Sequence, residues 1–105
     1  MMERYAFKMF LHAGHRDAYK KRHDEIWPEL AQLLREAGIR NYSIFLDEET
    51  NILFGYLERS VSHGMDRLPE HPVMRRWWDY MKDLMQTDAT GAPIAIRVDE
   101  VFHLD

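Results

Sequence analysis

The sequence predicts an α+β fold in which strands and helices follow one another in the order β-α-β-β-α-β. Three observations lead to this prediction. An aromatic and apolar segment opens the chain, two segments carry apolar residues at helical spacing, and a polar turn separates two alternating segments between them. This is the order of the ferredoxin-like arrangement, an antiparallel four-stranded sheet with both helices on one face. We expect residues 1–105 to form one domain.

The first strand and the first helix follow from the residues near the start of the chain. Residues 4–11 are aromatic or apolar at nearly every position, which is typical of a strand buried on both faces. Residues 15–37 carry a helical stripe that stops before Gly38, a common residue for a left-handed helix end. Pro28 should divide this helix into two pieces that meet near Trp27, with Pro28 at the first position of the second piece.

The middle of the chain predicts a hairpin. Residues 40–46 alternate, so that Tyr42, Ile44 and Leu46 share one face, and residues 52–58 return as the next strand. The polar residues 47–51 form the turn between them. Gly55 leaves a gap in the side-chain layer of the second of these strands, where a bend or a close-packed group would fit.

The last part of the chain predicts a helix and a final strand. Helical character is weak around residues 65–68 and strong over residues 73–85, after the helix start at His71-Pro72. Its core stripe consists of Met74, Trp77, Met81 and Leu84. Residues 86–93 form a loop, and residues 94–104 form a strand whose apolar phase slips around residues 99–100, which indicates a bulge.

Composition excludes several classes of function. The net charge of −4 and the pI of about 5.8 argue against a nucleic-acid partner, which would need a clustered cationic face. The absence of cysteine excludes disulfides, thiolate nucleophiles and Cys-ligated metals. No apolar segment is long enough to span a membrane, and the N-terminus lacks a signal-peptide core. We therefore expect a cytoplasmic protein.

The strands also predict a homodimer. Two helices cover only one side of a four-stranded sheet, yet large apolar side chains point to both sides, for example Ile44 against Phe45 and Leu53 against Phe54. A second copy of the chain, related by a two-fold axis, would cover the other side and form a barrel-like sandwich.

Tyr19 and His23 are the leading candidates for a functional site. They lie four residues apart and share one helix face, and an imidazole can exchange protons near neutral pH. The helix break at Pro28 frees backbone carbonyls nearby. Trp77 and Trp78 point about 100° apart on a helix, so one of them is expected to line a ligand site. Tyr42 is a further candidate, although packing roles remain the alternative for all five residues.

No motif for a metal or a cofactor accompanies these candidates. The other histidines, at positions 12, 15, 63, 71 and 103, lack the spacing of a metal site. The chain also has no glycine-rich phosphate loop, no isolated carboxylate pair and no serine nucleophile elbow. A histidine and tyrosine site with aromatic walls suits proton transfer on a small, neutral, polar molecule.

The sequence resembles the L-rhamnose mutarotase family. The resemblance is carried by residues 19–30 (Tyr-x-x-x-His-x-x-Ile-Trp-Pro-Glu-Leu), by residues 41–47 (Asn-Tyr-Ser-Ile-Phe-Leu-Asp), by residues 76–81 (Arg-Trp-Trp-Asp-Tyr-Met) and by residues 100–102. It implies a cytoplasmic, cofactor-free homodimer that interconverts the α and β anomers of L-rhamnose. It further implies that His23 is the proton donor, and that the sugar is bound by Tyr19, Tyr42, Trp77 and Trp78.

This chemistry fits the residues, but it leaves one role open. Ring opening needs a proton at the ring oxygen and the loss of one from the anomeric hydroxyl. His23 can serve one oxygen, while Tyr19, a carboxylate or a water could serve the other. Two other functions remain compatible with the residues: a cofactor-free or haem-dependent monooxygenase of the same dimeric fold, and a non-catalytic sugar-binding module.

Overall fold

A computed structural model describes residues 1–105, and its elements follow the expected order. The strands are β1 (Met2–Phe10), β2 (Ile39–Asp47), β3 (Ile52–Ser60) and β4 (Ile96–Val98). The helices are α1 (Arg16–Asp24), α2 (Pro28–Glu36) and α3 (Pro72–Met81), with a 3-10 helix, η1 (Met65–Glu70), before α3. None of these helices combines the length and the hydrophobicity that a membrane span requires.

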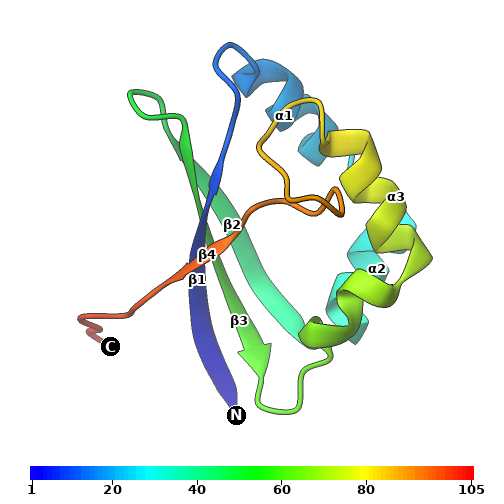
Figure 1. Cartoon of the computed structure of the whole chain (residues 1–105). Coiled ribbons are helices and arrows are strands. Elements are labelled where there is room, and N and C mark those ends of the chain that lie inside the picture. The colour runs from blue at the N-terminus through cyan, green and yellow to red at the C-terminus, as the bar shows by residue number, and fades with distance from the viewer.

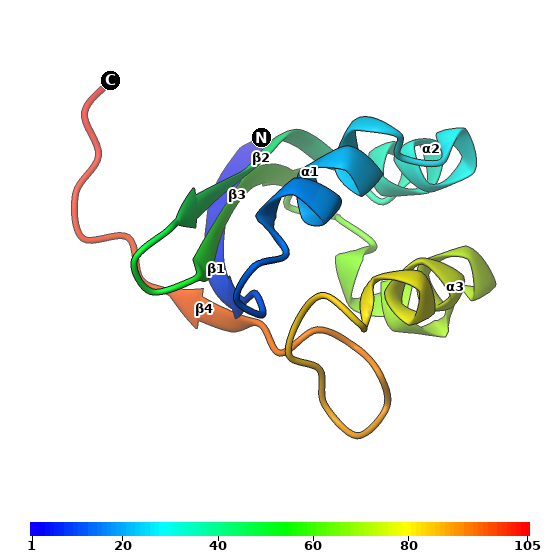
Figure 2. The same cartoon turned by 90° about the horizontal axis from the view of Figure 1, so that it is seen from above.

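The four strands form one antiparallel sheet in the order β2-β3-β1-β4. All helices lie on the same side of this sheet, and the C-terminal segment leaves on the opposite side (Figures 1 and 2). The predicted ferredoxin-like α+β fold is therefore confirmed. The layer between sheet and helices contains the core, and the other face of the sheet is left uncovered by this chain.

The predicted break in the first helical segment is confirmed. Trp27 has an extended backbone (φ −62°, ψ 131°), and Pro28 is the first residue of α2. Proline lacks the N–H that would continue α1 and keeps the preceding residue out of the helical region, so two separate helices form. The second ends before Gly38, whose φ of +89° is the left-handed conformation expected there.

The predicted hairpin is also confirmed, and Gly55 has the close-packed neighbour that the sequence suggested. β2 and β3 pair along their length, with Ile44 opposite Gly55 and Phe45 opposite Phe54. Phe7 lies opposite Gly55 on the other neighbouring strand, and its ring fills the space above the glycine. A Cβ atom at position 55 would overlap that ring, so only glycine fits.

The helix predicted over residues 73–85 is shorter than expected. α3 ends at Met81, and a turn carries the chain on to Met85. The core stripe is confirmed nevertheless, because Met74, Trp77, Met81 and Leu84 are all buried. The turn still delivers Leu84 to the core, and apolar spacing alone could not distinguish it from a further helical turn.

The prediction for the final strand was wrong in its extent and in its bulge. Only residues 96–98 pair with β1, and residues 99–105 have no strand partner in this chain. Beyond Val98 the segment is tied to β1 by a side-chain ion pair instead, between Arg4 and Glu100 at 2.6 Å. The one register shift of the sheet lies in β2, between Arg40 and Ser43, where Asn41 has a φ of +49°.

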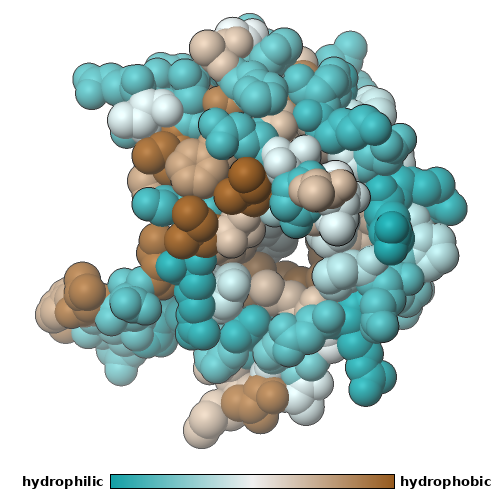
Figure 3. All heavy atoms as spheres, viewed as in Figure 1, coloured by the Kyte–Doolittle hydropathy of each residue, from teal (hydrophilic) through white to brown (hydrophobic).

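The expectation that the first strand is buried on both faces was also too strong. Phe7 and Met9 are buried on the helix side of β1, whereas residues on its other face are partly exposed. The same outer face of the sheet carries exposed Phe45, Phe54 and Ile96. Figure 3 shows apolar side chains gathered over the strands and on the projecting C-terminal segment. The sheet therefore has a large apolar surface without a cover in the single chain.

Candidate active site

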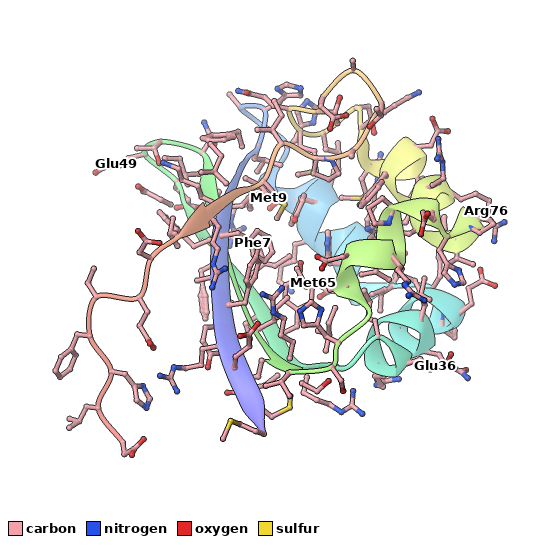
Figure 4. The ribbon with its side chains drawn as sticks, turned by 60° about the horizontal axis from the view of Figure 1, so that its bottom comes forward. Phe7, Met9, Glu36, Glu49, Met65 and Arg76 are labelled. Atoms are coloured by element: carbon pink, nitrogen blue, oxygen red, sulfur yellow. The ribbon has the colours of Figure 1, made fainter.

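A cavity of about 1040 Å³ lies between the inner face of the sheet and the helices. Figure 3 shows the surface hollowed there, and Figure 4 shows Phe7 and Met9 on the helix side of β1. Most of its wall is apolar. All five residues singled out from the sequence line this cavity, namely Tyr19, His23, Tyr42, Trp77 and Trp78.

His23 lies near the end of α1 and is held by Tyr19, one turn earlier. The two rings are stacked with centroids 4.2 Å apart, and the His23 Nδ1 atom lies 3.0 Å from the backbone carbonyl oxygen of Tyr19. A carbonyl only accepts hydrogen bonds, so Nδ1 carries a proton and Nε2 is the nitrogen available to a ligand. Burial lowers the pKa of His23 below its ordinary value of 6.5, against the raising effects of this hydrogen bond and of Asp24.

The two indoles form the α3 side of the site. Trp77 is buried and meets the His23 ring edge to face, with centroids 5.3 Å apart. Trp78 is partly buried and lines the same cavity from the next position of the helix. The sequence suggested that one indole belongs to the core and the other to a ligand site. In the structure Trp77 does both, because the cavity opens within the core layer.

The two phenols bring neutral hydrogen-bonding groups into the apolar wall. Burial raises the pKa of Tyr19, and the proximity of Tyr42 adds to this effect. Desolvation by the surrounding side chains also raises the pKa of Tyr42, which lines the cavity while 39% of its surface stays exposed. No fully enclosed polar side-chain atom of the chain lacks a hydrogen-bond partner. The Tyr19 hydroxyl, which has no partner within the chain, therefore opens onto the cavity. Both phenols stay protonated at neutral pH and can donate or accept a hydrogen bond there.

Charged residues at the mouth of the cavity were not singled out from the sequence. The Arg16 Nε atom of α1 lies 2.9 Å from the Glu48 carboxylate, which belongs to the turn between β2 and β3. This ion pair joins two segments across the cavity mouth, and both residues line it. No local pattern pairs a helix start with a hairpin turn, so only the tertiary structure could identify these residues.

Most carboxylates beside the cavity already have partners. Asp24 pairs with Lys20 at 2.8 Å, and Asp47 accepts hydrogen bonds from the Glu49 backbone N–H and the Thr50 hydroxyl. Glu49 lies at the hairpin tip, at the edge of the molecule away from the helices (Figure 4). No group of three histidine or acidic side chains is placed to hold a metal ion. The deep part of the site therefore offers one imidazole, two phenols and two indoles.

Comparison with known proteins identifies close relatives. The profile of a family described as L-rhamnose mutarotase matches residues 4–104. A relative from Jannaschia sp. (strain CCS1), named L-rhamnose mutarotase, is 57% identical over 98% of this chain and 99% of its own length. A relative of the same name from Brucella anthropi is 53% identical over 97% of this chain and 96% of its own.

Two solved structures are similar to this chain, one of them an L-rhamnose mutarotase. The crystal structure of an L-rhamnose mutarotase from Formosa agariphila has a TM-score of 0.91 and 46% identity, covering 98% of this chain and 99% of that chain. A protein from Mycobacterium tuberculosis has a TM-score of 0.61 over the full length of both chains at only 10% identity. The second likeness concerns the fold alone, because one fold carries many functions.

Proposed function

This chain belongs to the L-rhamnose mutarotase family, and on that premise we propose which of its residues carry out the reaction. The activity is the interconversion of the α and β anomers of L-rhamnose, which makes the protein an isomerase. The sugar ring opens to the aldehyde, the aldehyde group rotates, and the ring closes on the other face. The protein must therefore move protons between two oxygen atoms on the same carbon.

His23 is the residue that moves the proton, through Nε2. The neutral imidazole takes the proton of the anomeric hydroxyl while the bond between the anomeric carbon and the ring oxygen breaks. The resulting imidazolium then donates that proton to the ring oxygen. The anomeric and ring oxygens are bonded to the same carbon, so one nitrogen can reach both in turn. The lowered pKa of His23 supports this role, because it keeps the imidazole neutral at the start.

The other acidic groups near the cavity are poorly suited to proton transfer, which supports the proposal that His23 alone carries the proton between the two sugar oxygens. Raised pKa values make Tyr19 and Tyr42 poor proton-transfer acids, though they remain hydrogen-bond donors. Asp24 and Glu48 are already paired with Lys20 and Arg16. Tyr19 and the nearby carboxylates are therefore less suited than His23 to exchange a proton with the second oxygen of the sugar.

Tyr19, Tyr42, Trp77 and Trp78 bind the sugar in this proposal. The indole rings offer flat apolar surfaces to the C–H faces of the pyranose, and their N–H groups donate to hydroxyls. The phenols supply further hydrogen bonds within an apolar wall, where each bond discriminates strongly against a ligand that lacks the matching hydroxyl.

The observation that carries the proposal is the His23 Nδ1 contact with the Tyr19 carbonyl inside the cavity, because it leaves Nε2 as the only exchanging nitrogen. The test is His23→Ala, assayed by saturation-transfer NMR on the two anomers of L-rhamnose. Anomer exchange should fall by about 10²- to 10⁴-fold, the usual contribution of a general acid-base group.

The control for this test is His12→Ala, since His12 is exposed and does not line the cavity. That variant should exchange the anomers at the wild-type rate. Circular dichroism should show the same fold for both variants. Exchange at the wild-type rate in His23→Ala would remove His23 from the mechanism.

We also propose that the active form is a homodimer in which the uncovered sheet face is buried. Phe45 and Phe54 are 57% and 43% exposed and lie opposite each other on adjacent strands, where they form an apolar pair on that face. Burial of such a surface stabilises a domain of this size. Residues 1–105 act as one domain in this proposal, and the enzyme works in the cytoplasm, as expected from the sequence.

A further inference from the structure

We propose that Tyr80, which lies outside the cavity, is a positioning residue that holds His23 and Trp77 in their catalytic arrangement. It does so by fixing Arg22, the residue directly before His23, and Trp27, which lies four residues after it. The inference rests on the proposed role of His23. It assigns a role in catalysis to three residues that do not contact the sugar, namely Arg22, Trp27 and Tyr80. None of Tyr80, Arg22 and Trp27 lines the cavity.

The need for an anchor arises from the break between α1 and α2. α1 ends at Asp24, and α2 begins at Pro28. His23 is therefore in the last turn of a short helix. This turn is closed by hydrogen bonds from the Glu25 N–H to the Lys21 carbonyl and from the Ile26 N–H to the His23 carbonyl, and no helical hydrogen bond continues from it into α2. α1 also makes no extensive backbone contact with the sheet or the other helices. The direction of its last turn must be set by side chains.

Arg22 provides the first anchor. Its Nη1 atom donates to the Tyr80 carbonyl oxygen at 2.7 Å, and the guanidinium pairs with the two Asp83 carboxylate oxygens at 2.8 and 3.2 Å. The guanidinium carbon lies 4.5 Å from the centroid of the Tyr80 ring. A forked ion pair with a stacked ring fixes both the place and the plane of the arginine. These contacts hold the residue next to His23 against α3.

Trp27 provides the second anchor. Its ring is stacked on Tyr80 with centroids 5.6 Å apart, and it meets Trp77 edge to face at 5.1 Å. The extended backbone that Pro28 imposes on Trp27 takes this side chain out of the path of α1. The second anchor thus depends on the proline that ends the first helix.

The two anchors meet at Tyr80, and Trp77 connects them to the imidazole. Tyr80 lies one turn after Trp77 on α3, with ring centroids 5.8 Å apart. Trp77 in turn packs edge to face on His23. Loss of the Tyr80 ring would therefore remove the stacked contacts of Arg22, Trp27 and Trp77 together. Arg22 directly precedes His23 in the chain, and Trp77 packs on its ring.

The test compares Tyr80→Leu with Tyr80→Phe. The phenylalanine ring keeps the stacked contacts, and the Tyr80 hydroxyl forms no hydrogen bond within the chain, so Tyr80→Phe should keep kcat and KM within about twofold of wild type. Tyr80→Leu should lower kcat by about 10- to 100-fold and should raise KM by a smaller factor, because the misplaced imidazole reduces the rate more than the loosened Trp77 reduces binding. Equal kcat in the two variants would overturn the inference.

A second readout does not depend on activity. NMR titration of the His23 imidazole in the free protein should show its pKa rising toward 6.5 in Tyr80→Leu, because a loosened ring gains solvent. A loss of global stability alone would leave the pKa of the folded protein unchanged. An unchanged His23 titration in Tyr80→Leu would count against the proposal.

Variants of the Arg22–Asp83 ion pair keep the proposal testable if Tyr80→Leu does not fold. Arg22→Gln and Asp83→Asn should each lower kcat, and the double variant should be no worse than Arg22→Gln, since the two residues act as one unit. The matched control is Lys82→Gln, which breaks the ion pair between Lys82, directly after α3, and Asp79 in the last turn of α3, and leaves α1 untouched.

The control should keep the wild-type kcat. If Arg22→Gln does so as well, the inference fails. If His23→Ala is inactive while the Tyr80 and Arg22 variants are fully active, the proposed role of His23 is supported and the positioning role of Tyr80 is refuted. Full activity of His23→Ala would instead remove the proposed role of His23.

Discussion

The His23 imidazole and the Tyr19 phenol form a stacked pair in which the backbone of one residue determines the tautomer of the other. The rings are inclined by 26°, and the Tyr19 carbonyl accepts the Nδ1–H of His23. The pair lies on one face of α1 because its members are four residues apart. A single helical turn thus places a binding group and a proton-transfer group side by side.

The first prediction concerns the pH dependence of the reaction. Burial lowers the pKa of His23 below 6.5, and the proposed mechanism begins with the neutral imidazole. Activity should therefore be constant above pH 6.5 and should fall as the pH drops through the lowered pKa. The rate of anomer exchange, measured by NMR between pH 4.5 and 8 after subtraction of the buffer rate, checks this. A fall that begins above pH 7 would contradict it.

The same shift predicts the direction of a stability change. The unfolded chain binds a proton at His23 near pH 6.5, whereas the folded chain binds it only at lower pH. The contribution of His23 to stability should thus be present above pH 6.5 and should be lost as the pH falls through the folded-state pKa. Urea unfolding of wild type and His23→Gln at several pH values should show this loss in wild type alone.

The second prediction separates binding from proton transfer. Tyr19→Phe and Tyr42→Phe should each raise KM for L-rhamnose by about 5- to 30-fold, as expected for the loss of one hydrogen bond of about 1 to 2 kcal/mol. Their kcat should stay within a few-fold of wild type. Line-shape or saturation-transfer NMR over a range of sugar concentrations gives both constants. A large fall in kcat for Tyr19→Phe would instead indicate that this phenol transfers a proton.

The third prediction concerns the close contact between Gly55 and Phe7. Gly55→Ala should destabilise the protein by about 1 to 3 kcal/mol, the usual cost of overpacking a core, because the new methyl group overlaps the Phe7 ring. Urea unfolding followed by circular dichroism measures the change. The matched control is Gly64→Ala, where the nearest atom to the new methyl group is the Ala37 Cα atom at 3.9 Å. A similar loss in both variants would contradict the packing argument.

The fourth prediction concerns the uncovered face of the sheet. Phe54→Glu places a charge on the apolar pair with Phe45 and should convert the proposed dimer into a monomer, because burying an unpaired charge is costly. Sedimentation velocity or light scattering after size exclusion gives the mass. Glu49→Gln, on the exposed hairpin tip, serves as the control and should leave the mass unchanged. A monomeric wild-type protein would refute the dimer itself.

Local sequence patterns predicted most helices and strands correctly. The errors occurred where the same local pattern is compatible with more than one structure. The helix break at Pro28 and the helix end at Gly38 are dictated by the backbone of single residues, so they could be read directly. The final strand is different. Residues 99–104 are rich in apolar side chains, but a strand needs a backbone neighbour, and this chain supplies one only as far as Val98.

The sequence by itself determined the order of the elements and put Tyr19 and His23 on one helix face, because periodicity and the backbone restrictions of proline and glycine act over a few residues. Only the tertiary structure decided that Tyr42 faces the same cavity as His23 and that Tyr80 receives both Arg22 and Trp27. Contacts between distant segments depend on how strands pair and helices pack, and one-dimensional spacing does not encode those distances.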